Sequence, residues 1–359
     1  MSGKFEHKLF SEIDLNDPFF DELKKNYHEF EEKWFPKAVR ENREALVFSD
    51  EHGLGAFIAM KEEKEEIPLV DKILPARSRL KISTLRLAER FRGQRLGEGA
   101  LGLILWEWQR LKLEEVYVTV FPEHKDLINQ LSKFGFIYNG CNERGENVYI
   151  RSRKNIDFTD PYKSFPFVSP LFEKGGYLIV DDNYHDTIFP YSKLKNVLQE
   201  QLDIDVANGI SKIYIGNQRD VHYKSGEPIF IYRKFTGDGI KRYKSCLTSY
   251  GVVTQVYTIK RDGRCSIKFE DFCSLVGNKS IFPVEKLRQM YQQDKNITVV
   301  QLLYCGYFGS GNNINMDWLQ NNNLWSSNGV YPTNIQLSCQ QCKSIWNKAG
   351  TDVDNVFGK

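Results

Sequence analysis

A loop rich in glycine and arginine is the part of the chain whose residue types and spacing most directly suggest chemistry. It spans Arg92–Gly99, reads RGQRLGEG, and has glycines at positions 93, 97 and 99. A strand pattern precedes it and a helical pattern follows it. The first turn of a helix leaves backbone N–H groups unpaired, and glycine lets an anion approach without a Cβ in the way. The spacing indicates a pyrophosphate site, although a helix with a plain glycine entry would show the same spacing.

Two other phosphate-binding motifs do not fit this loop. A Walker loop needs Gly-Lys followed by Ser or Thr at the start of the helix, and the segment has none of these in register. A dinucleotide fingerprint needs G-x-G-x-x-G in an early βαβ unit, with an acidic residue about 20 residues further on. The sequence therefore favours neither a nucleoside triphosphatase nor a dinucleotide-binding enzyme.

A titratable pair, Glu123 and His124, follows the apolar run 115–121. His and Glu side chains commonly act as general acids and bases. These two residues are therefore the candidate acid–base groups. The alternative is that they simply cap the helical pattern that begins beside them.

A basic segment, Arg219–Lys268, holds eleven Lys and Arg residues against four Asp and Glu residues, interleaved with tyrosines. Cationic side chains bind a phosphate backbone and aromatic rings stack on bases. The alternative reading is solvated loops with core tyrosines. The residues predicted to bind nucleic acid are Tyr232, Arg233, Lys234, Lys241, Arg242, Tyr243 and Lys244.

The cysteines do not suggest a disulfide framework or a metal site. There are seven of them, and only Cys339 and Cys342 have the spacing of metal ligands. A structural zinc site needs two more ligands at similar spacing, and none follows. We therefore expect reduced thiols and no bound metal.

The order of predicted elements divides the 359-residue chain into two domains. The first half alternates: a strand over 7–15, a helix over 17–40, a hairpin of 44–49 and 54–62, and a strand over 79–87. A helix to about residue 112, a strand over 115–121, a helix over 124–134 and a strand over 148–153 follow. Beyond the proline- and glycine-rich stretch at 161–176 the runs become short and β-rich, with helices at 193–203 and 285–293. We place the boundary near residue 156, giving domains of 1–155 and 156–359.

The first domain resembles the GNAT acetyltransferases over about residues 6–154. The resemblance rests on Arg92-Gly-Gln-Arg-Leu-Gly97, on the preceding strand, and on a second βα unit that ends in Gly135-Phe136. It implies an α/β fold with a mixed sheet, acetyl-CoA as cofactor, and the Leu87 backbone N–H as the group that polarises the thioester. The usual tyrosine of the family corresponds to Leu131 here. The implied cofactor-binding residues are Thr84, Leu85, Arg86, Leu87, Arg92, Gly93, Gln94, Arg95, Leu96, Gly97, Glu98 and Gly99.

The second domain resembles the PUA-like barrels, including EVE and ASCH domains. The stretch from Tyr223 to Tyr257 carries the likeness: a Gly-Glu-Pro turn, an apolar strand, a basic loop and a second strand. The resemblance implies a β-rich pseudo-barrel with added helices that binds nucleic acid. An Asn- and Trp-rich extension would follow it.

Together these features predict an acetyl-CoA-dependent N-acetyltransferase whose acceptor is an RNA-linked amine, such as that of an aminoacyl-tRNA. Two alternatives stay open: a protein or small-molecule acceptor with the barrel as a scaffold, and a non-catalytic binder of modified nucleic acid. RNA or tRNA, a second copy of the chain and a regulatory protein are the partners considered. The sequence shows no membrane span and no secretory signal, so the cytoplasm is the expected compartment.

Overall fold

The computed structural model describes residues 5–192, 208–325 and 335–359, which form two compact units. The first unit contains Met1–Ile104, Leu113–Ser132 and Phe136–Lys154. The second contains Leu105–Lys112, Lys133–Gly135 and Asn155–Lys359. The helix predicted over 193–203 lies outside the described residues.

The first unit is built on a seven-stranded mixed sheet with the order β1-β2-β3-β6-β7-β9-β8. β6 and β7 run parallel, and the other neighbours are antiparallel. This arrangement fits the GNAT-like fold expected from the sequence. A separate hairpin pairs β4 with β5. The strands are β1 (Phe5–Leu9), β2 (Glu44–Asp50), β3 (Gly53–Glu63), β4 (Ile67–Pro68), β5 (Ile73–Leu74), β6 (Arg79–Leu87), β7 (Glu115–Val120), β8 (Ile137–Cys141) and β9 (Asn147–Ser152).

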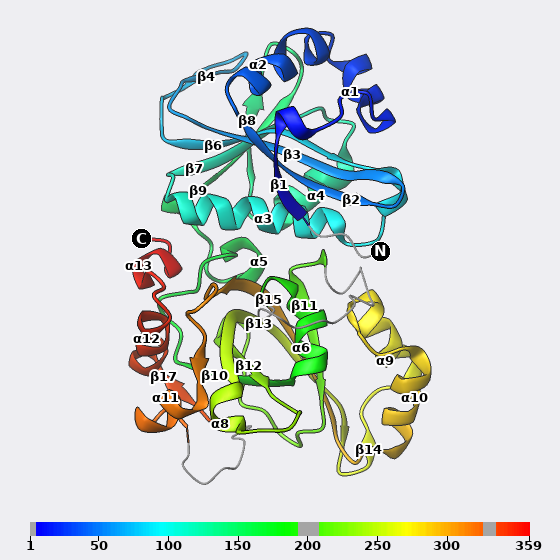
Figure 1. Ribbon diagram of the computed structural model, residues 1–359, viewed down its shortest axis with the longest axis vertical. Coiled ribbons are helices and arrows are strands. Elements are labelled where there is room, and N and C mark those ends of the chain that lie inside the picture. The colour runs from blue at the N-terminus through cyan, green and yellow to red at the C-terminus, as the bar shows by residue number, and fades with distance from the viewer. Residues whose placement is uncertain (1–4, 193–207, 326–334) are drawn as a thin grey trace. The chain divides into compact units, whose positions relative to one another are not determined.

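Helices lie on both faces of this sheet, with α1 and α2 on one side and α3 on the other (Figure 1). The α1 and α2 side is packed with aromatic rings: the Phe57 ring of β3 lies 5.2 Å from that of Phe20 and 5.6 Å from that of Phe10. These contacts hold the N-terminal helices against the sheet. The helices are α1 (Asp21–Asn26), α2 (Phe35–Arg40), α3 (Leu96–Leu111) and α4 (Lys125–Lys133), with a π-helix at Phe30–Trp34 and 3-10 turns at Phe10–Glu12, Pro18–Phe20, Glu89–Phe91 and Arg153–Asn155.

The structure corrects the predicted elements near the N-terminus. The strand expected over 7–15 ends at Leu9, and the single helix expected over 17–40 is broken. The break falls at Tyr27, whose φ of −130° and ψ of 89° are not helical. β8 and the β4–β5 hairpin were not predicted, because each is short and carries little periodic signal.

The second unit contains an eight-stranded sheet with the path β11-β15-β13-β12-β10-β17, while β14 and β16 pair with β13. A sheet-rich second region is thus present. In the described residues β11 and β17 lie at the two ends of the path and do not pair with each other, so the PUA-like barrel stays a prediction. The strands are β10 (Lys174–Asp181), β11 (Ser211–Gly216), β12 (Pro228–Lys234), β13 (Cys246–Arg261), β14 (Arg264–Cys265), β15 (Ile297–Tyr307), β16 (Ile314–Asn315) and β17 (Leu337–Ser338).

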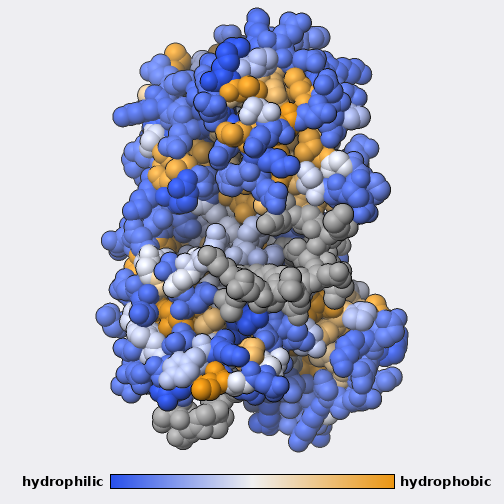
Figure 2. All heavy atoms as spheres, viewed as in Figure 1, coloured by the Kyte–Doolittle hydropathy of each residue, from blue (hydrophilic) through white to orange (hydrophobic). Residues whose placement is uncertain are grey.

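The helices of the second unit are mostly short, and most of them were not predicted. They are α5 (Pro161–Ser164), α6 (Asp182–Ile188), α8 (Lys241–Lys244), α9 (Phe269–Val276), α10 (Val284–Gln293), α11 (Met316–Asn321), α12 (Cys339–Lys348) and α13 (Val353–Val356), with 3-10 turns at Pro190–Ser192 and Gly277–Lys279. No helix among the described residues is long and apolar enough to cross a bilayer. The face shown in Figure 2 is largely hydrophilic, with hydrophobic residues in separate patches.

Candidate functional site

Two parallel strands separate at the centre of the first sheet. β6 pairs with β7 only from Arg79 opposite Glu115 to Ile82 opposite Val118. Beyond that point β6 continues along β3 to Leu87, while β7 continues along β9 to Val120. The divergence leaves one edge of the second half of β6 without a strand partner among the described residues.

A β-bulge marks the start of this open edge. Ala59 of β3 pairs with Thr84 and Met60 pairs with Ile82, so Ser83 is an extra residue in β6. A bulge bends the strand that carries it and increases its twist. This bend accounts for the separation of β6 from β7 directly after Ile82.

The backbone of Leu87 faces the open edge. The N–H of Ala88 donates to the carbonyl of Gly55 (2.8 Å), and antiparallel ladder bonds alternate from residue to residue. The N–H groups of Leu87 and Leu85 therefore point away from β3, toward the place that β7 has left. The side chains alternate as well: Arg86 points toward α1, whereas Leu87 points toward α3.

The glycine-rich loop brings the first turn of α3 against this strand end. A Cβ placed on Gly97 would lie 3.1 Å from Cδ1 of Leu87. Gly93 (φ 81°) and Arg95 (φ 59°) have left-handed backbones, which lets the loop turn sharply into the helix. Leu96 and Gly97 belong to the first helical turn, where N–H groups have no carbonyl of their own helix to bond. The first-turn amides of α3 and the open edge of β6 thus lie side by side.

The arginines in the glycine-rich loop and in the turn directly before it have different environments. Arg90 donates to Asp50 (2.8 Å) and to the carbonyls of Gly53 and Leu54, which ties the loop to the β2–β3 turn. Burial would raise the pKa of Asp50, but hydrogen bonds, chiefly from Arg90, hold it below its ordinary value.

The other two arginines, Arg92 and Arg95, differ in exposure. Arg95 pairs with Glu98 (3.0 Å), and its side chain is only 7% exposed. Arg92 is exposed. Arg92 is therefore the loop arginine best placed to reach a dissolved phosphate.

On the other face of the sheet, α1 is fastened to β6 beside the divergence. The Arg86 guanidinium donates to the carbonyl of Phe19 (2.7 Å), lies 5.3 Å from the Phe19 ring and pairs with the Glu22 carboxylate. The hydrogen bond that Arg86 donates to Glu22, together with the positive charge of Arg86, lowers the pKa of Glu22. The arrangement places polar groups of α1 over the open end of β6.

The predicted acid–base residues lie beyond the end of β7. Glu123 and His124 are exposed, and the His124 carbonyl accepts from the N–H of Ile128 at the start of α4. His124 interacts electrostatically with Glu22, so the two side chains lie on the same side of the sheet's open end. Leu131 is fully buried in α4. Of these positions, only Glu123 and His124 offer titratable side chains near the divergence.

Sequence reasoning missed two polar residues at the same place, Tyr27 and Glu146. Tyr27 ends α1 and its ring lies 6.3 Å from that of Phe121, which follows β7. Glu146 lies in the β8–β9 turn and is 6% exposed. The Asn142–Gly145 turn signal would have indicated a hairpin and so placed Glu146, whereas no sequence signal marks Tyr27.

In the second unit, two of the predicted nucleic-acid residues are interior. Tyr232 is fully buried, and its ring lies 4.6 Å from that of Trp325. Arg233 is 5% exposed and donates to both carboxylate oxygens of Asp186 (2.9 Å each). Side chains in these positions do not reach a nucleic acid at the surface, because the strand that carries them is buried on both faces. The structure thus does not support a nucleic-acid role for them.

The other five predicted residues are more accessible. Lys241, Arg242, Tyr243 and Lys244 form α8 and are exposed. Arg242 pairs with Asp317 (2.6 Å), and Lys234 with Asp181 (2.8 Å). Acidic neighbours therefore offset part of the positive charge that the sequence suggested.

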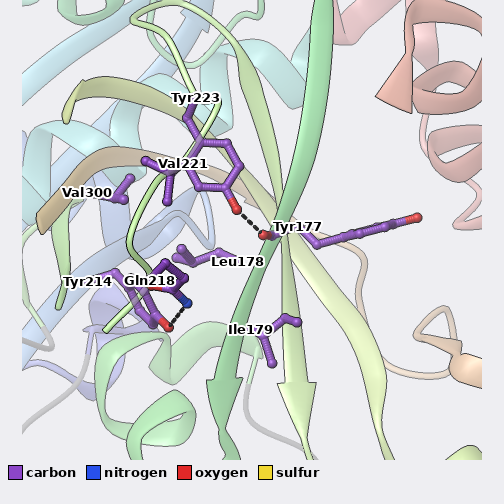
Figure 3. Close-up of a pocket in the computed structure, with 8 residues that line it drawn as sticks. All are labelled: Tyr177, Leu178, Ile179, Tyr214, Gln218, Val221, Tyr223 and Val300. Atoms are coloured by element: carbon purple, nitrogen blue, oxygen red, sulfur yellow. Dashed lines mark hydrogen bonds between the residues drawn. The ribbon is translucent and has the colours of Figure 1, made fainter. Parts of the chain in front are cut away.

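The cavities of the second unit differ in size. The one drawn in Figure 3 holds about 10 Å³, which is room for roughly one water molecule. Two hydrogen bonds join residues that line it, from Tyr223 to the carbonyl of Tyr177 (2.6 Å) and from Gln218 to Tyr214 (3.2 Å). A larger cavity of about 240 Å³ is lined by residues that include Ile213 and Phe282. The cavity of Figure 3 is too small for a base or a cofactor.

The paired cysteines lie in α12. Cys342 is buried and burial raises the pKa of its thiol well above the ordinary value, while Cys339 is half-buried. Within the described ranges, no group of three His, Cys, Asp or Glu side chains is placed to hold a metal ion.

No family model matches this sequence, and no curated protein matches it. Solved structures similar to part of the chain include Ard1 from Thermoplasma volcanium, at 14% identity over 42% of this chain and 98% of the other, with a TM-score of 0.32. Another is Naa50 from Arabidopsis thaliana in complex with the bisubstrate analogue CoA-Ac-MVNAL, at 20% identity over 42% and 99%, with a TM-score of 0.30. A GNAT-family acetyltransferase from Streptococcus agalactiae matches at 16% identity over 41% and 95%, with a TM-score of 0.29.

Proposed function

We propose that the first unit is an acetyl-CoA-dependent N-acetyltransferase. The observation that carries this proposal is the open edge of β6 beside the first turn of α3. An extended pantetheine arm can pair with main-chain groups at an open strand edge, and a pyrophosphate fits the first-turn amides of a helix. The N–H of Leu87 points to the same edge, where it would polarise the thioester carbonyl.

The residues present fit this cofactor, with one refinement of the predicted set. Within Thr84–Leu87, the ladder directs the N–H groups of Thr84 and Arg86 to β3, so Leu85 and Leu87 supply the groups on the open edge. Arg92–Gly99 supplies the anion site at the start of α3. The chemistry that acetyl-CoA brings is an acyl group activated as a thioester.

Calorimetry with acetyl-CoA tests the proposal first. Gly97→Trp should lose binding, because a bulky side chain would fill the space between α3 and Leu87. A far-UV spectrum and a melting curve of the variant show whether its fold is intact. Thiol release is then followed with three acceptors: spermidine, a peptide with a free N-terminus and charged tRNA. Failure of the wild-type protein to bind acetyl-CoA, or to release thiol with any amine, would contradict the proposal.

For the acceptor we propose an RNA-linked primary amine. The support comes from α8, where Tyr243 is 58% exposed and is flanked by Lys241, Arg242 and Lys244. An exposed aromatic ring between cations suits a base stacked beside its phosphate. Turnover with charged tRNA supports this acceptor, whereas turnover with spermidine or the peptide alone supports the protein or small-molecule alternative. Multiple turnover with any acceptor excludes a non-catalytic binder.

A further inference from the structure

The larger cavity of the second unit, about 240 Å³, lies where the described strands do not close the sheet. Residues 179–181 of β10 and 213–216 of β11 both line it, so we call it the β10–β11 cavity. Among the described residues, β11 pairs with β15 alone, and this end of β10 pairs with β12 alone. Successive side chains of a strand point to opposite faces, so a cavity lined by four consecutive residues of β11 reaches the unpaired edge of that strand.

Two hydrophobic clusters meet at the β10–β11 cavity and give it apolar walls. Val180 and Ile188 belong to a cluster formed with β12 and β13, whereas Ile213 belongs to a cluster formed with α9 and α10. Phe282 and Met290 pack against the second cluster. An apolar cavity of about 150 Å³ is large enough to bind benzene. The β10–β11 cavity therefore has room for one aromatic ring and a short arm.

Three aromatic side chains line the same cavity. The ring of Tyr184 in α6 lies 5.3 Å from that of Phe282, at an angle of 73°. Tyr184 is 39% exposed, so its ring also meets solvent. Tyr214 of β11 lines both this cavity and the smaller one drawn in Figure 3. The face of an aromatic ring attracts a cation as well as another ring, so these walls suit a ligand that carries both.

The charged groups that line the cavity are carboxylates. They belong to Asp181 and Asp294, and the described lining contains no Lys, Arg or His. Asp181 is paired with Lys234 (2.8 Å), whereas Asp294, directly after α10, has no salt-bridge partner among the described residues. Lys260 at this end of α10 donates to the carbonyl of Tyr291 (2.8 Å) instead. The lining thus carries one uncompensated negative charge beside apolar and aromatic walls.

We propose that the β10–β11 cavity binds a small arylalkylammonium ion, with the aromatic ring among the apolar side chains and the ammonium group at Asp294. An anionic ligand such as a phosphate or a carboxylate would meet the Asp294 carboxylate without a lining cation to offset it, and burying an unpaired charge is costly. The inference is independent of the acetyl transfer proposed above, because every residue that it uses belongs to the second unit.

The first test locates the ligand, with phenethylammonium as the probe. Met290 lines the cavity, whereas Met60 lies in β3 and Met316 in α11. In protein labelled with ¹³C at the methionine methyl groups, and with the signals assigned from single Met→Leu variants, the probe should shift the NMR signal of Met290. The signals of Met60 and Met316 should stay in place. A probe that leaves Met290 unmoved, or that moves all three signals equally, overturns the proposal.

The second test changes the charge of the ligand and keeps its ring and arm. Phenethyl alcohol and phenylpropionate carry the same ring and the same ethylene arm, but they end in a neutral hydroxyl and in a carboxylate. Phenethylammonium should bind about tenfold more tightly than either, the difference expected from one hydrogen bond to a charged group. Its affinity should fall as the salt concentration rises, because salt screens the attraction to Asp294. Equal affinities of the three probes would show a purely apolar cavity and overturn the assignment of a cation.

Substitutions in the lining test the roles of single residues. Asp294→Asn removes the carboxylate charge, so the dissociation constant of phenethylammonium should rise about tenfold and that of phenethyl alcohol should not change. Asp271→Asn, at an exposed aspartate of α9, is the matched control and should keep the wild-type affinity. Tyr184→Leu should weaken binding about two- to fivefold, because it removes one ring face.

The signals of Met60 and Met316 show whether each variant keeps its fold. A wild-type dissociation constant for phenethylammonium in folded Asp294→Asn, or an equal loss in Asp271→Asn, overturns the proposal. Neither result bears on acetyl-CoA binding by the first unit, so the two proposals fail independently.

Discussion

Gly97 in the first turn of α3 lies against Leu87 at the end of β6, with only 3.1 Å between the position of a Cβ and Cδ1 of Leu87. This contact sets the distance between the helix amides and the backbone N–H of Leu87. Gly97→Ala requires a shift of a few tenths of an ångström, so acetyl-CoA affinity should fall by no more than about threefold. Gly97→Leu should cost about tenfold or more, because a larger side chain must move the helix or the strand. Calorimetry of both variants measures the difference; equal affinities would show that this contact does not shape the site.

The Arg86–Glu22 pair should make a small contribution to stability that depends on pH. The hydrogen bond and charge of Arg86 lower the pKa of Glu22 from its ordinary 4.5. The contribution is therefore complete above about pH 4.5 and is lost as the pH falls through the lower folded pKa. Because the Glu22 side chain is 56% exposed, solvent screening limits the effect at pH 7 to about 1 kcal/mol or less.

Denaturant unfolding of the wild-type protein and Glu22→Gln at pH 7 and pH 3 measures this dependence. The difference in unfolding free energy between the two proteins should shrink at pH 3. A difference that grows on acidification would contradict the assigned direction of the pKa shift.

The elements around the cofactor loop were predictable because their signals are local. The strand expected over 79–87 is β6, and the helix expected to end near residue 112 ends at Leu111. Alternating apolar residues, a glycine-rich entry and a long amphipathic run each report on a few neighbouring residues. The backbone part of the site follows from such signals. The bulge at Ser83 does not, because it depends on pairing with β3.

The side chains of the site depend on contacts between residues far apart in the sequence. Arg86 and Glu22, for example, pair only because α1 lies over the end of β6. Arg233 is a second example. A basic residue beside a tyrosine suggested an exposed surface, but Arg233 is buried and donates to Asp186 of α6. Composition cannot distinguish a cation that faces solvent from one that is paired inside.

Arg233 should be a stability determinant. His185 bonds Asp186 (2.8 Å) and Thr248 (2.8 Å), and Asp186 also accepts both Arg233 bonds. Removal of one partner of a buried ion pair costs about 3–5 kcal/mol, because the other charge stays buried and unpaired. Arg233→Met should therefore lower the unfolding free energy by that amount. The neighbouring control, Lys234→Met, breaks the more exposed pair with Asp181 and should cost about 1 kcal/mol or less. Urea denaturation compares the two variants, and similar losses would argue against the buried network.

If α8 binds RNA, substitutions of its residues should weaken RNA binding in two distinguishable ways. Lys241→Ala removes a phosphate contact, so it should reduce affinity and make the slope of log K against log salt shallower by about 0.7 for a single strand. Tyr243→Ala removes a stacking surface worth about 1–3 kcal/mol and should leave the salt slope unchanged. Lys286→Ala in α10, an exposed lysine on another helix, is the control and should change neither quantity. Fluorescence anisotropy with labelled tRNA across a salt series gives both numbers. Equal effects of Lys241→Ala and Lys286→Ala would reduce the interaction to non-specific attraction by surface charge, and would leave α8 without a role in choosing the acceptor.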